Sequence, residues 1–179
     1  DTTGLMVVAK SLQAHTSLVR QLQERTVSRH YRAIVCGELI AGGTIDKPIG
    51  RHPTQRTKMA VLDLSNTQAR HAVTHYRVRS RFRHFTEIDV YLETGRTHQI
   101  RVHMAHIKHP LLGDPTYNPR HKRPKDISDH QNQALQQFDR QALHAYKLSF
   151  IHPCSMEPCE FQAEPPNDYL ALIELVSSF

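Results

Sequence analysis

The fold is decided where a strand joins a short basic helix, in the stretch Glu93-Thr94-Gly95-Arg96-Thr97-His98-Gln99-Ile100-Arg101-Val102-His103. Upstream of it, the apolar residues Ile88, Val90 and Leu92 alternate with polar or aromatic neighbours, which is the period of a half-buried strand. Gly95 ends that alternation. From about Thr97 the apolar residues recur at helical spacing, so the sequence predicts a strand, a glycine turn and a helix in succession.

Arg101 lies on the flank of this expected helix, one position away from the buried stripe of Ile100, Met104 and Ile107. An arginine in that position can be partly buried. Its planar guanidinium binds a carboxylate or a phosphate through two parallel hydrogen bonds. Spacing alone therefore leaves two interpretations open: a structural pair with a carboxylate, and a residue of an active site.

Length and charge restrict the class of protein. A chain of 179 residues suits one domain, residues 1–179, that can bury a real core. The net charge of +6, with 14 histidines not counted, favours a polyanionic partner. No apolar run approaches the ~20 residues of a membrane span, and no signal segment opens the chain. We expect a cytoplasmic monomer without a membrane partner, whose three cysteines are reduced.

The remaining elements follow from periodicity and capping. Strands are predicted over residues 4–10, 27–36, 143–150 and 159–163, with a helix after Ser11 and a last helix capped by Asn167. Strands outnumber helices and do not alternate strictly with them. The expected fold class is therefore α+β, with a mixed, largely antiparallel sheet and covering helices.

Three segments are strongly cationic. Residues 49–59 predict a cationic loop or hairpin tip, which is either solvated or in contact with nucleic acid. Residues 118–133, which include Arg120, Arg123 and Lys125, predict a partly mobile surface insertion. Along an expected strand at residues 76–84, arginines occur at every second position, namely Arg77, Arg79, Arg81 and Arg83.

Four arginines at alternate positions should share one side of a strand. They would repeat every ~6.6 Å, which is comparable to the spacing of phosphates along an RNA strand. The alternative is that they pair across the sheet with the acidic residues of the next strand, Glu87, Asp89 and Glu93.

Metal and hydrolase chemistry are disfavoured. His103, His106 and His109 each lie about 300° further round a helix than the last, so they do not converge on one metal ion. There is no Gly-x-Ser-x-Gly turn, and no cysteine lies in a catalytic context. We expect no metal and no cofactor.

A family resemblance is carried by Gly95-Arg96-Thr97-His98-Gln99-Ile100-Arg101-Val102-His103, followed by His109-Pro110-Leu111-Leu112-Gly113-Asp114-Pro115. Other segments agree in order: Asp1-Thr2-Thr3-Gly4-Leu5, Tyr31-Arg32-Ala33-Ile34-Val35 and Leu143-His144-Ala145. Over nearly its whole length the chain resembles the ribosomal large-subunit pseudouridine synthases. Arg51-His52-Pro53-Thr54 is similar in particular to the members that modify 23S ribosomal RNA.

The resemblance implies an RNA partner and the catalytic-domain fold of that family. The implied reaction breaks a uridine glycosidic bond, turns the base and rejoins it through carbon, after the base has entered a pocket. By resemblance, Arg101 keeps a nucleophilic aspartate ionised and oriented. Tyr31 would stack on the uracil, and we favour this over a role as a base because a phenol is a poor base near neutrality. The expected RNA contacts are Arg51, Arg56, Arg96, His98, Arg77 and Arg79.

The N-terminus bears on catalysis. In the family, the catalytic aspartate precedes Asp-Thr-Thr-Gly by two positions, so Asp1 corresponds to a neighbour of that aspartate. We expect a catalytic domain that lacks its nucleophile and any upstream S4-like domain, binds RNA weakly and makes no pseudouridine. Arg101 should then be an unpaired cation. The alternative is a non-catalytic RNA-binding domain.

Overall fold

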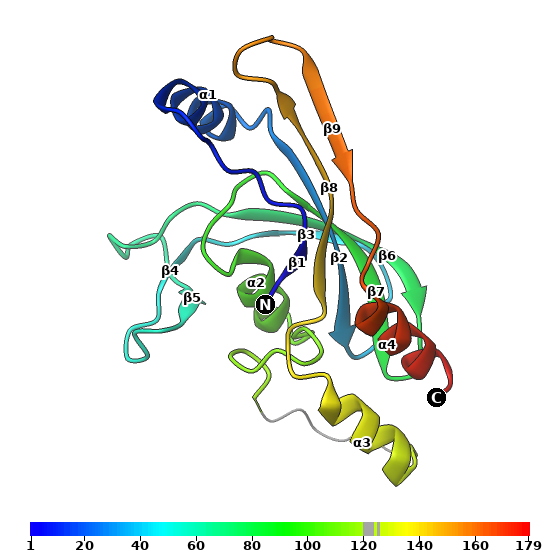
Figure 1. Ribbon diagram of the computed structural model, residues 1–179. Helices are drawn as coiled ribbons and strands as arrows, with labels where there is room; N and C mark the ends of the chain where they lie inside the picture. The colour runs from blue at the N-terminus through cyan, green and yellow to red at the C-terminus, as the bar shows by residue number, and fades with distance from the viewer. Residues whose placement is uncertain (120–123, 125) are drawn as a thin grey trace.

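A computed structural model describes residues 1–119, 124 and 126–179 (Figure 1). The main sheet of the described residues has the order β1-β8-β2-β7-β6-β3, with β9 paired to the far part of β8. Its strands are β1 (Thr3–Gly4), β2 (Ser28–Cys36), β3 (Gly43–Asp46), β6 (Val73–Arg81), β7 (Phe85–Leu92), β8 (Leu143–Ile151) and β9 (Pro158–Gln162). Among the described strands of this sheet, only β1 and β8 pair in parallel. The predicted class, a mixed and largely antiparallel α+β sheet, is confirmed.

A separate hairpin and helices complete the described part. The hairpin is formed by β4 (Ile49–Arg51) and β5 (Met59–Val61), as predicted for residues 49–59. The helices are α1 (Leu12–Gln23), α2 (Gln99–His106), α3 (Asp129–Gln137) and α4 (Asn167–Ser177). Ser11 caps α1 as predicted, since its hydroxyl accepts a hydrogen bond from the Ala14 amide at 3.2 Å. The N-cap of α4 is Pro166, one residue before the expected Asn167.

The sheet buries both of its faces. On one face, Ala33 and Val35 of β2 and Ile88 and Val90 of β7 pack with residues of α2. On the other face, residues of β2 and β7 pack with α3 and α4 around Tyr169, which is fully buried. In Figure 1 the N-terminus lies beside α2 near the middle of the view, and α4 lies at the right with the C-terminus. The alternation on β7 therefore decides which side chains face α2.

The predicted strand over residues 4–10 is wrong. Only Thr3 and Gly4 pair with β8, and the chain then leaves the sheet with Met6 83% and Val8 69% exposed. Gly4 has a φ of 95°, and a Cβ there would overlap the Ala145 carbonyl oxygen. After this left-handed turn the chain leaves the sheet, with Leu5, Val7 and Ala9 half-buried and Met6 and Val8 in solvent.

The predicted insertion over residues 118–133 is partly wrong. Residues 120–123 and 125, which carry its basic character, lie outside the described residues. Its C-terminal part forms α3, which starts with a capping box between Ser128 and Gln131. Ile127 and Leu135 are buried against α4. Two apolar residues in a polar segment were enough to attach it to the core.

The four strand arginines do not share one side. The ladder between β6 and β7 shifts between Val78 and Ser80, so Arg79 is an extra residue without an opposite partner. Before this bulge Arg77 pairs with Asp89, and after it Arg81 pairs with Thr86. Asp89 and Thr86 are three residues apart on β7, so they lie on opposite faces of the sheet. Arg83 lies beyond the end of β6.

Candidate active site

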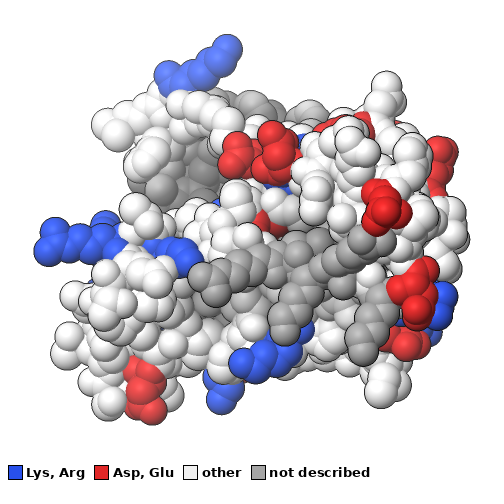
Figure 2. Space-filling view, turned by 90° about the horizontal axis from the view of Figure 1, so that it is seen from below, with Lys and Arg blue, Asp and Glu red and all other residues white. Residues whose placement is uncertain are grey.

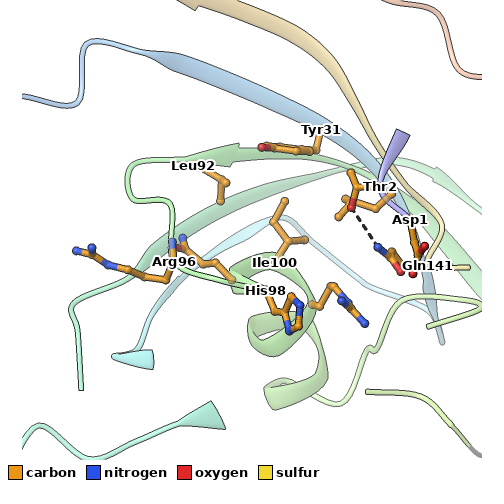
Figure 3. A pocket seen from close by; sticks show the side chains of 11 residues that line it. Asp1, Thr2, Tyr31, Leu92, Arg96, His98, Ile100 and Gln141 are labelled. Carbon is orange, nitrogen blue, oxygen red and sulfur yellow. Dashed lines mark hydrogen bonds between the residues drawn. The ribbon is translucent and has the colours of Figure 1, made fainter. Parts of the chain in front are cut away.

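A cavity of about 500 Å³ opens between the sheet and α2. Figure 3 shows Tyr31 of β2, Leu92 of β7 and Ile100 of α2 around it, with Arg96 at one end. Asp1 and Thr2 line its other end, where the Thr2 hydroxyl accepts a hydrogen bond from Gln141 at 3.1 Å. The cavity thus combines an apolar wall with several polar and charged side chains, which can orient a bound ligand.

The joint between β7 and α2 is fixed by one buried amide. The Gln99 oxygen accepts from the Thr94 hydroxyl at 2.8 Å and from the Arg96 amide at 2.9 Å. Its nitrogen donates to the Val73 carbonyl at 2.9 Å and to the Thr74 hydroxyl at 3.0 Å. Because every polar group of a 2% exposed side chain is used, the joint is locked to β6. The sequence did not assign this role to Gln99.

Arg101 forms a buried ion pair with Asp114. Its Nε donates to Oδ2 and its Nη2 to Oδ1, both at 2.7 Å. Asp114 is fully buried and also accepts from the amides of Thr116 and Tyr117. Burial by itself would raise the pKa of the Asp114 carboxyl, but these hydrogen bonds and the charge of Arg101 leave that pKa below its ordinary value. The expectation of an unpaired Arg101 is therefore wrong.

The pair does not remove Arg101 from the cavity. Arg101 lines the cavity, and its guanidinium lies 5.0 Å from the centre of the Tyr117 ring. Asp114 and the ring hold the guanidinium in one orientation. The two interpretations left open by spacing are thus compatible, because the structural pair positions a cation at the cavity wall.

Tyr31 presents its ring to the same cavity. Burial raises the pKa of Tyr31, an effect that the nearby Arg29 opposes. The hydroxyl is therefore protonated at neutral pH. A protonated phenol cannot accept a proton, so the geometry favours stacking as the role of this ring.

His98 connects the cavity to the β4–β5 hairpin. Its Nδ1 lies 3.0 Å from the Tyr117 hydroxyl oxygen, which also accepts a hydrogen bond from the Met59 amide at 2.9 Å. Burial, and then the charge of Arg101, lower the pKa of His98, so its ring is neutral at pH 7. His98 is thus a neutral hydrogen-bonding group at the cavity.

Two predicted RNA contacts, Arg51 and Arg56, are exposed residues of the β4–β5 hairpin. Arg51 lines an adjoining cavity of about 470 Å³ that also includes Arg96. Arg56 is exposed at the tip of the hairpin, and neither Arg51 nor Arg56 has a carboxylate partner in the described residues. Arg96 uses its Nε to bind the His71 carbonyl at 2.9 Å. Figure 2 shows long cationic side chains at its left edge, whereas most acidic residues lie toward its right.

Arg77 and Arg79 are not brought to this site. Tyr31 pairs with Val90 and Arg77 with Asp89, so Arg77 faces the opposite side of the sheet. Arg77 lies 5.8 Å from the centre of the Tyr91 ring. Arg79 lies 3.4 Å from Glu87 and 3.7 Å from Asp89. It thus forms the cross-strand ion pairs that were the alternative to RNA contact. RNA contact by Arg77 stays a prediction.

The described part of the chain has neither a metal-binding cluster nor a membrane-spanning helix. Within residues 1–119, 124 and 126–179, no three His, Cys, Asp or Glu side chains are grouped so as to hold a metal ion. No helix among these residues is both long and apolar enough to cross a bilayer.

Comparisons with known proteins agree with one another. The family model described as "RNA pseudouridylate synthase" matches residues 1–106. "Ribosomal large subunit pseudouridine synthase D" of Pasteurella multocida is 52% identical over 99% of this chain and 54% of the relative. The protein of that name from Pseudomonas aeruginosa is 55% identical over 98% and 54%. The chain spans about half the length of the curated relatives it matches.

Solved structures show the same fold. "Human RNA Pseudouridylate Synthase Domain Containing 1" has a TM-score of 0.68 and 28% identity, covering 89% of this chain and 63% of that chain. "Human RNA Pseudouridylate Synthase Domain Containing 4" has a TM-score of 0.74, covering 96% and 70%. At 23% identity, the second likeness concerns the fold alone.

Proposed function

Because this chain belongs to the RNA pseudouridylate synthase family, we propose that the protein encoded by its native gene isomerises uridine to pseudouridine in the 23S RNA of the large ribosomal subunit. The observation that carries the proposal is the cavity between Tyr31 and Arg101. Its volume of about 500 Å³ is in the range of small-ligand sites and suits a base taken out of an RNA stack.

The residues present divide the task. Tyr31, Leu92 and Ile100 form an apolar wall on which a uracil can stack. Arg101, oriented by Asp114, stabilises the negative charge of the aspartate that the family's reaction uses. Arg96 and His98 lie at the rim, where the flanking RNA enters. These cavity groups come from one chain, so we propose a monomer, which acts in the cytoplasm.

The test is formation of pseudouridine. The protein encoded by the native gene should convert specific uridines in unmodified 23S RNA, which carbodiimide labelling and primer extension would map. An Arg101→Gln variant should bind this RNA and leave it unmodified. Tight RNA binding by the unaltered protein without any pseudouridine would instead identify a non-catalytic RNA-binding domain.

Tyr31→Ala should weaken binding of the substrate RNA by about ten- to hundredfold, since stacking of a base on an aromatic ring is worth roughly 1–3 kcal/mol. Tyr31→Phe should keep the affinity, because it keeps the ring. Filter binding at fixed salt measures both. Equal losses in the two variants would contradict the stacking role and point to the hydroxyl.

Arg51→Gln and Arg56→Gln should each reduce the magnitude of the slope of log affinity against log salt concentration by about 0.7, the amount expected for one phosphate of single-stranded RNA. Arg79→Gln is the matched control, because it removes the same charge from a side chain that faces Glu87 and Asp89. Its slope should equal that of the unaltered protein. If Arg79→Gln lowered the slope and the hairpin variants did not, the RNA would run on the other face.

A further inference from the structure

A second cavity lies next to the Tyr31 cavity. It has a volume of about 380 Å³ and is enclosed by the end of α1, by Arg25 and Arg29, and by residues 93–96. Arg96 lines both cavities. The two cavities are therefore neighbours that share Arg96, so consecutive units of one chain molecule could occupy them.

Arg29 places its charge in this second cavity. Arg29 and Tyr31 are two residues apart on β2, so their side chains share the face that looks toward α2. Their backbones are separated by ~6.6 Å along the strand. The Arg29 guanidinium lies against Gly95, where a Cβ would overlap Nη1 and lie 3.1 Å from Cζ. The absence of a side chain at Gly95 thus makes room for the guanidinium.

The Arg29 guanidinium lacks a counterion in the protein. Among the described residues no carboxylate forms an ion pair with it, and its Nε is buried without a hydrogen-bond partner. Glu93 lines the same cavity but binds Arg25 at 2.8 Å and His75 at 2.6 Å. Burial lowers the pKa of Arg29, which is the cost of holding this cation away from water.

A bound anion would offset that cost. The rest of the rim adds positive charge, because Arg96 has no carboxylate partner within the described residues. Two guanidinium groups around one opening suit a phosphate, whose oxygens accept bidentate hydrogen bonds from arginine. A phosphodiester is also the anion that lies within one nucleotide of a stacked base.

We propose that Arg29 and Arg96 bind the RNA phosphodiester that adjoins the uridine held in the Tyr31 cavity. The proposal rests on the proposed function and extends it, since it fixes the direction in which the RNA leaves the cavity. The strand passes over Gly95 toward the C-terminal end of α1. Arg29 is then a positioning residue, because it holds the backbone and not the reacting base.

The first measurement is the salt dependence of RNA binding. Arg29→Gln should weaken binding by about ten- to hundredfold at low salt, as expected for a lost charge-assisted hydrogen bond. It should also reduce the magnitude of the slope of log affinity against log salt concentration by about 0.7. Arg20→Gln is the matched control, because Arg20 is an exposed arginine of α1 that lies outside the second cavity. The control should change neither quantity, and an unchanged slope in Arg29→Gln would overturn the proposal.

The second measurement changes the RNA and compares the unaltered protein with Arg29→Gln. Neutral methylphosphonate linkages are placed singly in a substrate RNA, on either side of the modified uridine and three nucleotides away. One adjoining linkage should weaken binding to the unaltered protein about tenfold or more, and the distant linkage should not. Arg29→Gln should distinguish the adjoining-linkage RNA from the normal RNA by a smaller factor than the unaltered protein does, and the remaining factor is the contribution of Arg96. If it still distinguishes them by the original factor, Arg29 does not bind that phosphate.

The two hypotheses fail separately. Pseudouridine formation by the unaltered protein, together with discrimination that survives in Arg29→Gln, refutes the phosphate site and leaves the enzyme. Discrimination that depends on Arg29, without any pseudouridine, refutes the proposed function and leaves an RNA phosphate site.

Discussion

Asp114→Asn should lower the free energy of unfolding by about 3–5 kcal/mol, the range measured when one partner of a buried ion pair is removed. The asparagine keeps the shape but leaves the Arg101 guanidinium, whose side chain is 10% exposed, without a counterion. It also weakens the turn in which Asp114 accepts from the amides of Thr116 and Tyr117. Urea unfolding at pH 7 followed by circular dichroism measures the loss.

The loss should depend on pH. The pKa of Asp114 in the folded protein lies below its ordinary value of 3.8. Its contribution to stability is therefore present above about pH 4 and is lost as the pH falls through the folded-state pKa. The unaltered protein and Asp114→Asn should approach each other in stability at acid pH. Asp63→Asn, the same change at an exposed site, is the control and should resemble the unaltered protein. If Asp114→Asn lost no more free energy of unfolding at pH 7 than the control, the ion pair would not stabilise the fold.

Arg101→Lys should lower turnover by about a hundredfold, while RNA affinity stays within a few-fold. Lysine keeps the charge but cannot make the two parallel hydrogen bonds to Asp114, so its position at the cavity wall is lost. A displacement of about 1 Å in a catalytic group costs on the order of 10²-fold in rate. Single-turnover pseudouridine formation with saturating protein separates this loss from binding.

The control for that variant is Arg140→Lys. Arg140 also donates two hydrogen bonds to an aspartate, Asp168, but it does not line the cavity. Turnover should be unchanged in Arg140→Lys. Near-normal turnover in Arg101→Lys would mean that Arg101 supports the fold and has no part in the reaction.

Local pattern predicted the elements whose backbone is regular. The alternation of Ile88, Val90 and Leu92 predicted β7, and the helical spacing after Thr97 predicted α2. Both patterns are visible in the sequence because β7 and α2 pack apolar residues against each other. The run of residues 4–10 failed. Hydrophobicity is the same whether a segment continues a strand or leaves it, and the positive φ of Gly4 decides between the two.

Pairings between distant residues were harder to predict. Tyr31 and Arg101 were placed at one site through resemblance, and both line the cavity. The partner of Arg101 is 13 residues away, on a turn whose path depends on the whole core, so spacing could not select Asp114. The bulge at Arg79 is likewise a property of two strands, and the sequence of β6 alone could not locate it. The charge of Arg29 in its cavity depends on Gly95, which lies on another element.

The Tyr117 hydroxyl connects the β4–β5 hairpin to the Tyr31 cavity. One oxygen accepts from the Met59 amide on the hairpin and lies 3.0 Å from His98 at the start of α2, while the ring covers Arg101. A movement of the hairpin must therefore be followed by His98 or must break one of these contacts. Linkage between two such events is reciprocal. If binding of a ligand at the hairpin changes the position of Tyr117 and thereby the affinity of the Tyr31 cavity, then binding in the cavity must change the affinity of the hairpin by the same factor.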